Sequence, residues 1–207
     1  MIASWSTLII PLLFLLLRPH RLSNASWLIP VYMLLHFIAD RLQDLFHSPH
    51  THSCISFSFV LLEYALLSSF LYLVLQKKRN RRLVLAGSLL FAILVCLTWM
   101  RWGAGYYGSI RGISVILLIS YIMFFFMEWI TAEQFEPINT RLEFWMVTGS
   151  LLYLAGNFFY FITIHNVIKE SLLLHYLVNI LRNACFLTAM IQIYQSGKNA
   201  GQPMKDC

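Results

Sequence analysis

The feature that most constrains this chain is a succession of apolar runs separated by short polar stretches. These runs cover residues 2–17, 25–39, 54–75, 83–100, 112–130, 144–164 and 172–194. A helix needs about 20 mainly apolar residues to cross a hydrocarbon core of about 30 Å, so runs of this length suit membrane spans. Spans of this number use nearly all of the 207 residues and leave no room for a soluble domain. The sequence therefore predicts an all-α integral membrane protein, a bundle of about seven transmembrane helices.

The charge composition agrees with this prediction. Only 12% of the residues are charged and 59% are hydrophobic, whereas soluble domains carry about 25% charged residues. The net charge of +6 comes from basic residues that stand in short tracts between the apolar runs. This is the pattern of membrane orientation signals. We therefore expect membrane lipids as partners and no nucleic acid.

The distribution of Lys and Arg predicts the orientation, because cytoplasmic loops are enriched in them. An N-terminus outside puts on the inner side Arg18, Arg21, Lys77, Lys78, Arg79, Arg81, Arg82, Arg141, Lys198 and Lys205. It puts on the outer side Arg41, Arg101, Arg111 and Lys169. The prediction is an N-out, C-in bundle over residues 1–194 with a short disordered cytoplasmic tail at 195–207. If the short run 25–39 is instead interfacial or re-entrant, the count must be redone.

Two charged residues lie near the middle of predicted spans. Glu63 is in the run 54–75 and Arg182 in the run 172–194, and the topology puts both at the same depth. A charge at the centre of a membrane helix is costly, so such residues usually pair and face the bundle interior. We expect Glu63 and Arg182 to be partners, either as a structural pair that sets helix register or as a pair linked to function.

The run 172–194 has a polar face. Its residues His175, Asn179, Arg182 and Asn183 recur at a spacing of three to four residues, which places them on one side of a helix. Such a face cannot point at lipid, so we expect it to point into the bundle.

The run 144–164 has a similar face. It offers Tyr153 and Asn157 for hydrogen bonds, while Gly149 and Gly156 predict close approach to a neighbouring helix.

The run 25–39 presents Tyr32, His36 and Asp40 at intervals of four residues. The topology places His36 and Asp40 toward the outer end of the bundle, close to His175 and above the level of Glu63 and Arg182. An outward-facing polar cavity follows; in the alternative, each histidine is satisfied by a neighbouring hydroxyl or backbone carbonyl. The candidate ligand-binding residues are His36, Asp40, Glu63, Tyr153, Asn157, His175, Asn179, Arg182 and Asn183.

No reaction chemistry is indicated. The loop after residue 40 contains His47, His50 and His52, but no Cys or Glu completes a metal site nearby, so we expect solvated histidines and no cofactor. The loop from Arg101 to Arg111 is rich in glycine and tyrosine. Nucleophile-elbow, zinc-protease and paired-aspartate motifs are absent from the sequence, which makes an enzyme the less favoured class.

Three segments resemble signatures of a family. They are LEYALLS at 62–68, FWMVTGSLLYLAGNFF at 144–159 and HYLVNILRN at 175–183. They are similar to segments of small uncharacterised bacterial multi-spanning proteins, which themselves resemble the membrane halves of sensor kinases. The resemblance implies the architecture, the polar positions and a bacterial cytoplasmic (inner) membrane location, and it supplies no substrate.

Three functions remain open. The first is a sensory or signal-coupling membrane protein that binds a small or lipophilic ligand and acts through a separate cytoplasmic partner such as a histidine kinase. The second is a transporter or channel subunit, in which Glu63, Arg182 and Asn179 at the midplane form a proton or ion site. The third is an intramembrane lipid-modifying enzyme. The sequence favours the first and sets neither a ligand nor an oligomeric state.

Overall fold

In the computed structural model, the described residues are 7–9, 11–13, 27–46, 48–131, 141–163 and 168–199, and every regular element in them is helical. The elements are α2 Leu28–Leu45, α3 Pro49–Val74, α4 Lys78–Trp102, the short 3-10 helix η1 Gly103–Tyr106, α5 Tyr107–Thr131, α6 Leu142–Thr163 and α7 Ile168–Asn199. The all-helical class is confirmed for these residues. Most of the predicted first span, residues 2–17, lies outside them.

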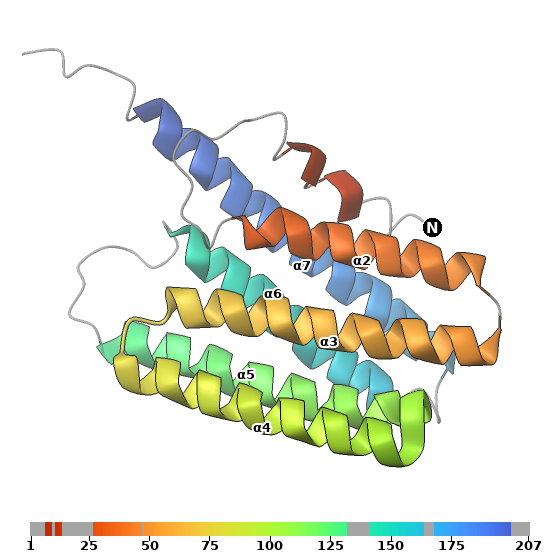
Figure 1. Cartoon of the computed structure of the whole chain (residues 1–207). Coiled ribbons are helices and arrows are strands. Elements are labelled where there is room, and N and C mark those ends of the chain that lie inside the picture. Colours follow the sequence, from red (N-terminus) through yellow and green to blue (C-terminus); the bar gives the residue numbers. More distant parts are fainter. Residues whose placement is uncertain are drawn as a thin grey trace, which may run out of the picture.

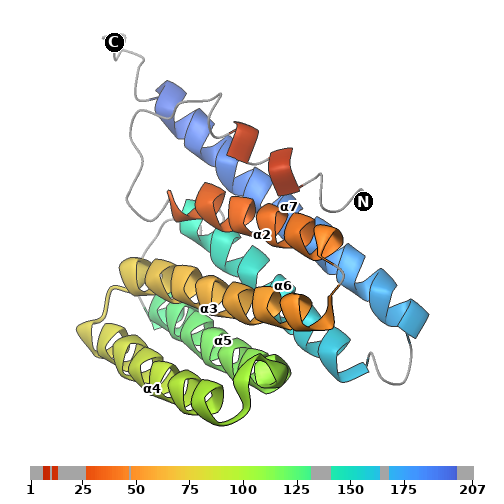
Figure 2. The ribbon, with the colours of Figure 1, turned by 45° about the vertical axis from the view of Figure 1, so that its right-hand side comes forward.

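The helices form an up-and-down bundle in which neighbours in the chain also contact each other in space (Figure 1). The helix α3 contacts α2 on one side and α4 and α5 on the other, while α6 joins α5 to α7 (Figure 2). The helices α2, α3, α6 and α7 thus surround a common interior, and α4 lies at the edge of the bundle.

Three helices, α3, α4 and α5, are long and apolar enough to cross a membrane. Among the described residues, α2, α6 and α7 do not meet the same criterion. In α2 the reason is its charge, since Asp40, Arg41 and Asp44 lie near its end.

The outer surface of α4 is apolar. Leu89, Leu90 and Met100 are 65%, 68% and 84% exposed. Exposed contiguous apolar surface of this kind suits contact with lipid tails or another apolar surface and not with water.

The connection between α4 and α5 is tighter than the predicted loop from Arg101 to Arg111. Gly103 has φ 65°, a left-handed conformation that favours glycine, and its backbone N–H donates to the Trp99 carbonyl to end α4. The helix η1 follows, and α5 begins at Tyr107. Arg111 therefore lies within α5, because the tyrosines and glycines after Gly105 are taken up into helix.

The connection between α2 and α3 also differs from the prediction. Helix α2 continues to Leu45, and α3 begins at Pro49, a favoured residue for a first helical turn. His50 and His52 are consequently helical and exposed, and His47 is outside the described residues. The part of the chain that the structure describes contains no group of three metal-ligating side chains.

The glycines of α6 serve close packing against α7, as predicted. A Cβ atom on Gly149 would lie 2.9 Å from the Cβ atom of Cys185, and one on Gly156 would meet the Val178 Cγ2 atom at 2.2 Å. Real Cβ atoms do not approach so closely, so a larger residue at either position would separate the two helices. Helix α7 itself continues to Asn199, so the first residues of the predicted tail are helical.

Candidate functional site

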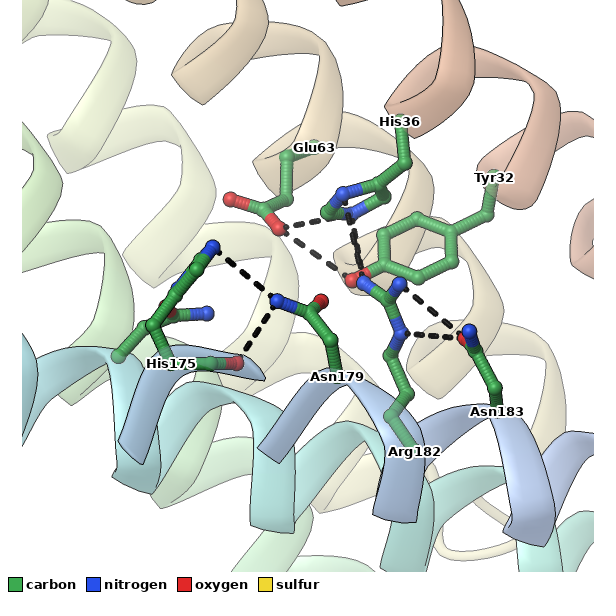
Figure 3. Close-up of polar contacts among 8 residues, drawn as sticks. Tyr32, His36, Glu63, His175, Asn179, Arg182 and Asn183 are labelled. Carbon is green, nitrogen blue, oxygen red and sulfur yellow. Dashed lines mark hydrogen bonds and ion pairs between the residues drawn. The ribbon is translucent and has the colours of Figure 1, made fainter. Parts of the chain in front are cut away.

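A chain of three polar side chains crosses the middle of the bundle. Glu63 of α3, His36 of α2 and Arg182 of α7 are 3%, 5% and 1% exposed. The His36 Nε2 atom lies 3.2 Å from the Glu63 Oε1 atom, and the Arg182 Nη1 atom lies 3.3 Å from the His36 Nδ1 atom. Figure 3 shows the imidazole between the two charged groups.

The predicted direct pair of Glu63 and Arg182 is therefore wrong. Both residues lie at the same level, as expected, but His36 separates them. His36 was expected nearer the outer end. It lies deeper because α2 extends from Leu28 to Leu45, so that His36 is at the middle of the helix.

The proton positions in this chain follow from the chemistry of the partners. A guanidinium can only donate, and a carboxylate can only accept. The Arg182 Nη1 atom lies almost equally far from Nδ1 and Nε2, at 3.3 and 3.4 Å. Because Nε2 also lies 3.2 Å from Glu63 Oε1, it donates to the carboxylate, and Nδ1 is left as the acceptor for Arg182. The imidazole is thus neutral and connects an anion to a cation.

Aromatic rings enclose the charged chain. The Cζ atom of Arg182 lies 4.4 Å from the centre of the Tyr153 ring, a cation–π contact from α6. The His36 ring meets the rings of Tyr32, Phe59 and Tyr153 edge-on at 4.5, 4.8 and 5.0 Å. Side chains therefore pack closely around the imidazole where an outward-facing cavity was expected.

Three further hydrogen bonds surround the charges. The Tyr32 hydroxyl donates to Glu63 Oε1 at 3.3 Å. On the other side, the Asn183 Oδ1 atom accepts from Arg182 Nε at 3.3 Å and from Nη2 at 3.2 Å. Tyr32 and Phe59 were missing from the predicted site. The signal for Tyr32 was its position one turn before His36, whereas Phe59 is an ordinary apolar residue with no such signal.

A second polar cluster joins α6 to α7 farther along the bundle. The His175 Nδ1 atom lies 2.8 Å from Asn157 Oδ1, and the His175 Nε2 atom lies 3.1 Å from Asn179 Nδ2. The same Asn179 Nδ2 atom donates to the His175 carbonyl at 2.9 Å. His175 is therefore bonded to the amide side chains of Asn157 and Asn179.

The hydrogen bonds of this cluster determine which way each amide side chain turns and which ring nitrogen of His175 carries the proton. The His175 carbonyl only accepts, so the nitrogen of Asn179 must face it and must also donate to Nε2. The ring proton is then on Nδ1, and Asn157 must offer its oxygen to it. The Nδ2 donor of Asn157 remains, buried and without a hydrogen-bond partner.

Two further residues lie at the edge of these clusters. Asp40 is one turn beyond His36 on α2, and its side chain is exposed. Arg111 of α5, which was interpreted as a loop charge, is within electrostatic reach of Glu63 and of His175. Eight of the predicted site residues thus lie in two clusters, one around His36 and one around His175, and Asp40 lies outside both. Figure 3 labels His36, Glu63, His175, Asn179, Arg182 and Asn183 among them.

The predicted site does not include Glu128, a buried carboxylate at the other end of α5. Its Oε2 atom accepts from the Gln76 backbone N–H at 2.7 Å, and its Oε1 atom accepts from the Lys77 N–H at 3.1 Å and from Asn80 Nδ2 at 2.8 Å. A carboxylate at a helix N-terminus satisfies free N–H groups and interacts favourably with the helix dipole. Glu128 therefore holds the turn between α3 and α4 and has a structural role.

Comparisons of this chain with protein-family models, with curated proteins and with solved structures return no match.

Proposed function

We propose that the chain is a multi-pass protein of a bacterial cytoplasmic membrane, with seven spans, its N-terminus outside and its C-terminus inside. Support comes from the three apolar helices of spanning length and from the apolar exterior of α4. The turn between α3 and α4 is flanked by the exposed basic residues Lys77, Lys78, Arg79 and Arg82, which favours the cytoplasm for that end.

We propose further that this protein senses a small or lipophilic ligand and acts through a separate cytoplasmic partner, such as a histidine kinase. This partner fits the family that the sequence resembles. The observation that carries the proposal is the chain from Glu63 through His36 to Arg182, because it joins α2, α3 and α7 by polar contacts in an apolar interior. Ionisable residues at such a position are costly and usually belong to a functional site.

The arrangement provides a way to transmit binding. A ligand that competes for Arg182, His36 or Tyr153 would exchange one set of buried polar contacts for another, and the helices that carry them would shift. A ligand changes a conformation only by binding one arrangement better than the other. Helix α7 is the natural output, since it carries Arg182 and continues to Asn199 at the proposed cytoplasmic end.

The test is a thermal-shift screen of the purified protein with lipids, quinones and metal ions. We expect a saturable rise of the unfolding temperature with one ligand class, no turnover of that ligand, and loss of the rise in His175→Ala. Tyr153→Phe keeps the ring beside Arg182 and is the matched variant. Chemical turnover of a lipid that either variant abolishes would contradict the proposal and favour an enzyme.

A transporter or channel subunit is the second candidate, and one observation favours it. His36 and Glu63 can each take up and release a proton, and the 3.2 Å between His36 Nε2 and Glu63 Oε1 allows a proton to pass between them, while Arg182 stays charged. Proton flux into proteoliposomes that is abolished by His36→Phe would support this function. A flux equal to that of empty liposomes would rule it out.

A further inference from the structure

The start of α4 carries a cluster of five basic residues, Lys77, Lys78, Arg79, Arg81 and Arg82. Two of them are bound by the protein itself. The Lys77 Nζ atom donates to Thr131 Oγ1 at 3.0 Å. Arg81 donates from Nε to the Leu75 carbonyl and from Nη2 to the Leu73 carbonyl at the end of α3. These two cations therefore stabilise the turn between α3 and α4.

The other three basic side chains, those of Lys78, Arg79 and Arg82, are exposed. In the part of the chain that the structure describes, none of the three forms an ion pair. The carboxylate of Glu128 lies at this turn, but it already accepts from two backbone N–H groups and from Asn80. Three cations at one end of α4 are thus available to an anion outside the described bundle.

The cations stand at one end of an exposed stripe that follows α4. Its members recur at intervals that place them on one side of a helix with 3.6 residues per turn. They are Lys78, Arg79, Arg82, Leu85, Leu89, Ile93 and Met100, all of them exposed. The opposite side of α4 packs against α3 and α5. Because α4 lies at the edge of the bundle (Figure 1, Figure 2), the stripe faces outward.

The stripe has the polarity and the length of a phospholipid. From Arg82 to Ile93 the helix rises about 16 Å, at about 1.5 Å per residue. This is about half of a hydrocarbon core of about 30 Å, the depth of one leaflet. A lipid in that leaflet presents a phosphate at the surface and acyl chains below it, and the stripe offers cations and then apolar side chains in the same order. An acidic protein segment would use the cations alone.

We propose that α4 binds an anionic phospholipid in the leaflet next to the turn between α3 and α4. Lys78, Arg79 and Arg82 hold the headgroup, and an acyl chain lies along the apolar part of the stripe. Basic clusters of this size beside a membrane helix attract anionic headgroups, whereas a zwitterionic headgroup carries no net charge. The inference rests on the proposed membrane location and is independent of the proposed sensing of a ligand.

The experiment measures the unfolding temperature of the full chain in an uncharged detergent during a titration with phosphatidylglycerol. Phosphatidylcholine with the same acyl chains is the control for the acyl part, and glycerol phosphate is the control for a headgroup without chains. We expect a saturable rise with phosphatidylglycerol and little or none with either control. The rise should weaken at high salt, because salt screens exposed charges.

Substitutions of the three cations test the headgroup contact. Each of Lys78→Gln, Arg79→Gln and Arg82→Gln should raise the apparent Kd for phosphatidylglycerol about fivefold, and the triple variant about a hundredfold. The matched control is Arg101→Gln, which removes an exposed cation from the other end of α4 and should leave the Kd unchanged. The unfolding temperature without lipid shows whether each variant folds, and each single variant remains informative if the triple variant does not.

Three results would overturn the lipid site. The first is a rise with phosphatidylcholine as large as that with phosphatidylglycerol, or no rise with either lipid. The second is a loss of affinity in Arg101→Gln equal to that in Arg82→Gln, which would indicate attraction to the charge of the whole chain. The third is binding of polyglutamate as tight as that of phosphatidylglycerol and weakened by the same substitutions, which would favour an acidic protein partner.

The membrane location itself has a separate readout. If the lipid site fails while the chain stays in the membrane fraction after an alkaline wash, the location stands and only the lipid site is rejected. If the wash releases the chain, the proposed location fails together with the lipid site.

Discussion

The Glu63 carboxylate and the Arg182 guanidinium are both almost fully buried, and the imidazole of His36 is their shared neighbour. Burying opposite charges is tolerable only when each is compensated, and removing one partner leaves an orphaned charge. Here the compensation passes through a neutral ring that donates to one group and accepts from the other. The three residues should therefore behave as one energetic unit.

The first prediction concerns this unit. Glu63→Gln alone and Arg182→Leu alone should each lower the free energy of unfolding in detergent by about 3–5 kcal/mol. The double variant should recover much of the loss, because no orphaned charge remains. The recovery should be smaller when the parent, both single variants and the double variant all carry His36→Phe, because the imidazole that joins the two charges is then absent. Simple addition of the two single losses would show that the charges are independent.

At the scale of helices, the close contact between α6 and α7 depends on glycines, which have no Cβ atom. The second prediction is that Gly156→Ala destabilises the protein by about 1–3 kcal/mol, the cost of overpacking, since its Cβ atom would overlap Val178. Val178→Ala should rescue it. Gly112→Ala on α5 is the control, because nothing lies within 4 Å of its Cβ position. An equal loss at both glycines would indicate a general effect of the substitution and not helix packing.

The N-terminus of α4 supplies a third prediction. Glu128→Ala removes the acceptor of two backbone N–H groups and of Asn80. The free energy of unfolding should fall by about 1–3 kcal/mol, the cost of leaving such donors unsatisfied. Glu128→Gln keeps one carbonyl acceptor and should lose less. Amide hydrogen exchange at Gln76 and Lys77 should become faster in Glu128→Ala, and unchanged exchange would contradict the capping role.

At the scale of the whole molecule, the bundle places the ends of its helices at two opposite surfaces. The turn between α3 and α4 is at one end, and the connections from α2 to α3 and from α4 to α5 are at the other. The fourth prediction is that reporter fusions after Lys78 and Lys198 are cytoplasmic, and that fusions at Ser48 and Gly105 are outside. A cytoplasmic signal at Gly105 would reverse the proposed orientation.

The polar faces of α6 and α7 could be recognised in the sequence because helical periodicity is a local property. Residues such as His175, Asn179 and Arg182 share a face wherever the helix is placed. The same locality explains the errors. Helix ends depend on capping contacts such as that of Glu128, so the start of α4 at Lys78 and the inclusion of Arg111 in α5 were not visible in local composition.

What the sequence by itself determined is an all-helical chain with apolar segments of spanning length, the buried depth shared by Glu63 and Arg182, and the small residues that let α6 approach α7. Only the tertiary structure decided that His36 stands between the two charges, that Tyr153 covers Arg182 and that Asn157 is left with a free donor. These contacts join residues as far apart as 146 positions. They depend on the axial register of packed helices, which the fit of many apolar side chains sets together and no short segment encodes.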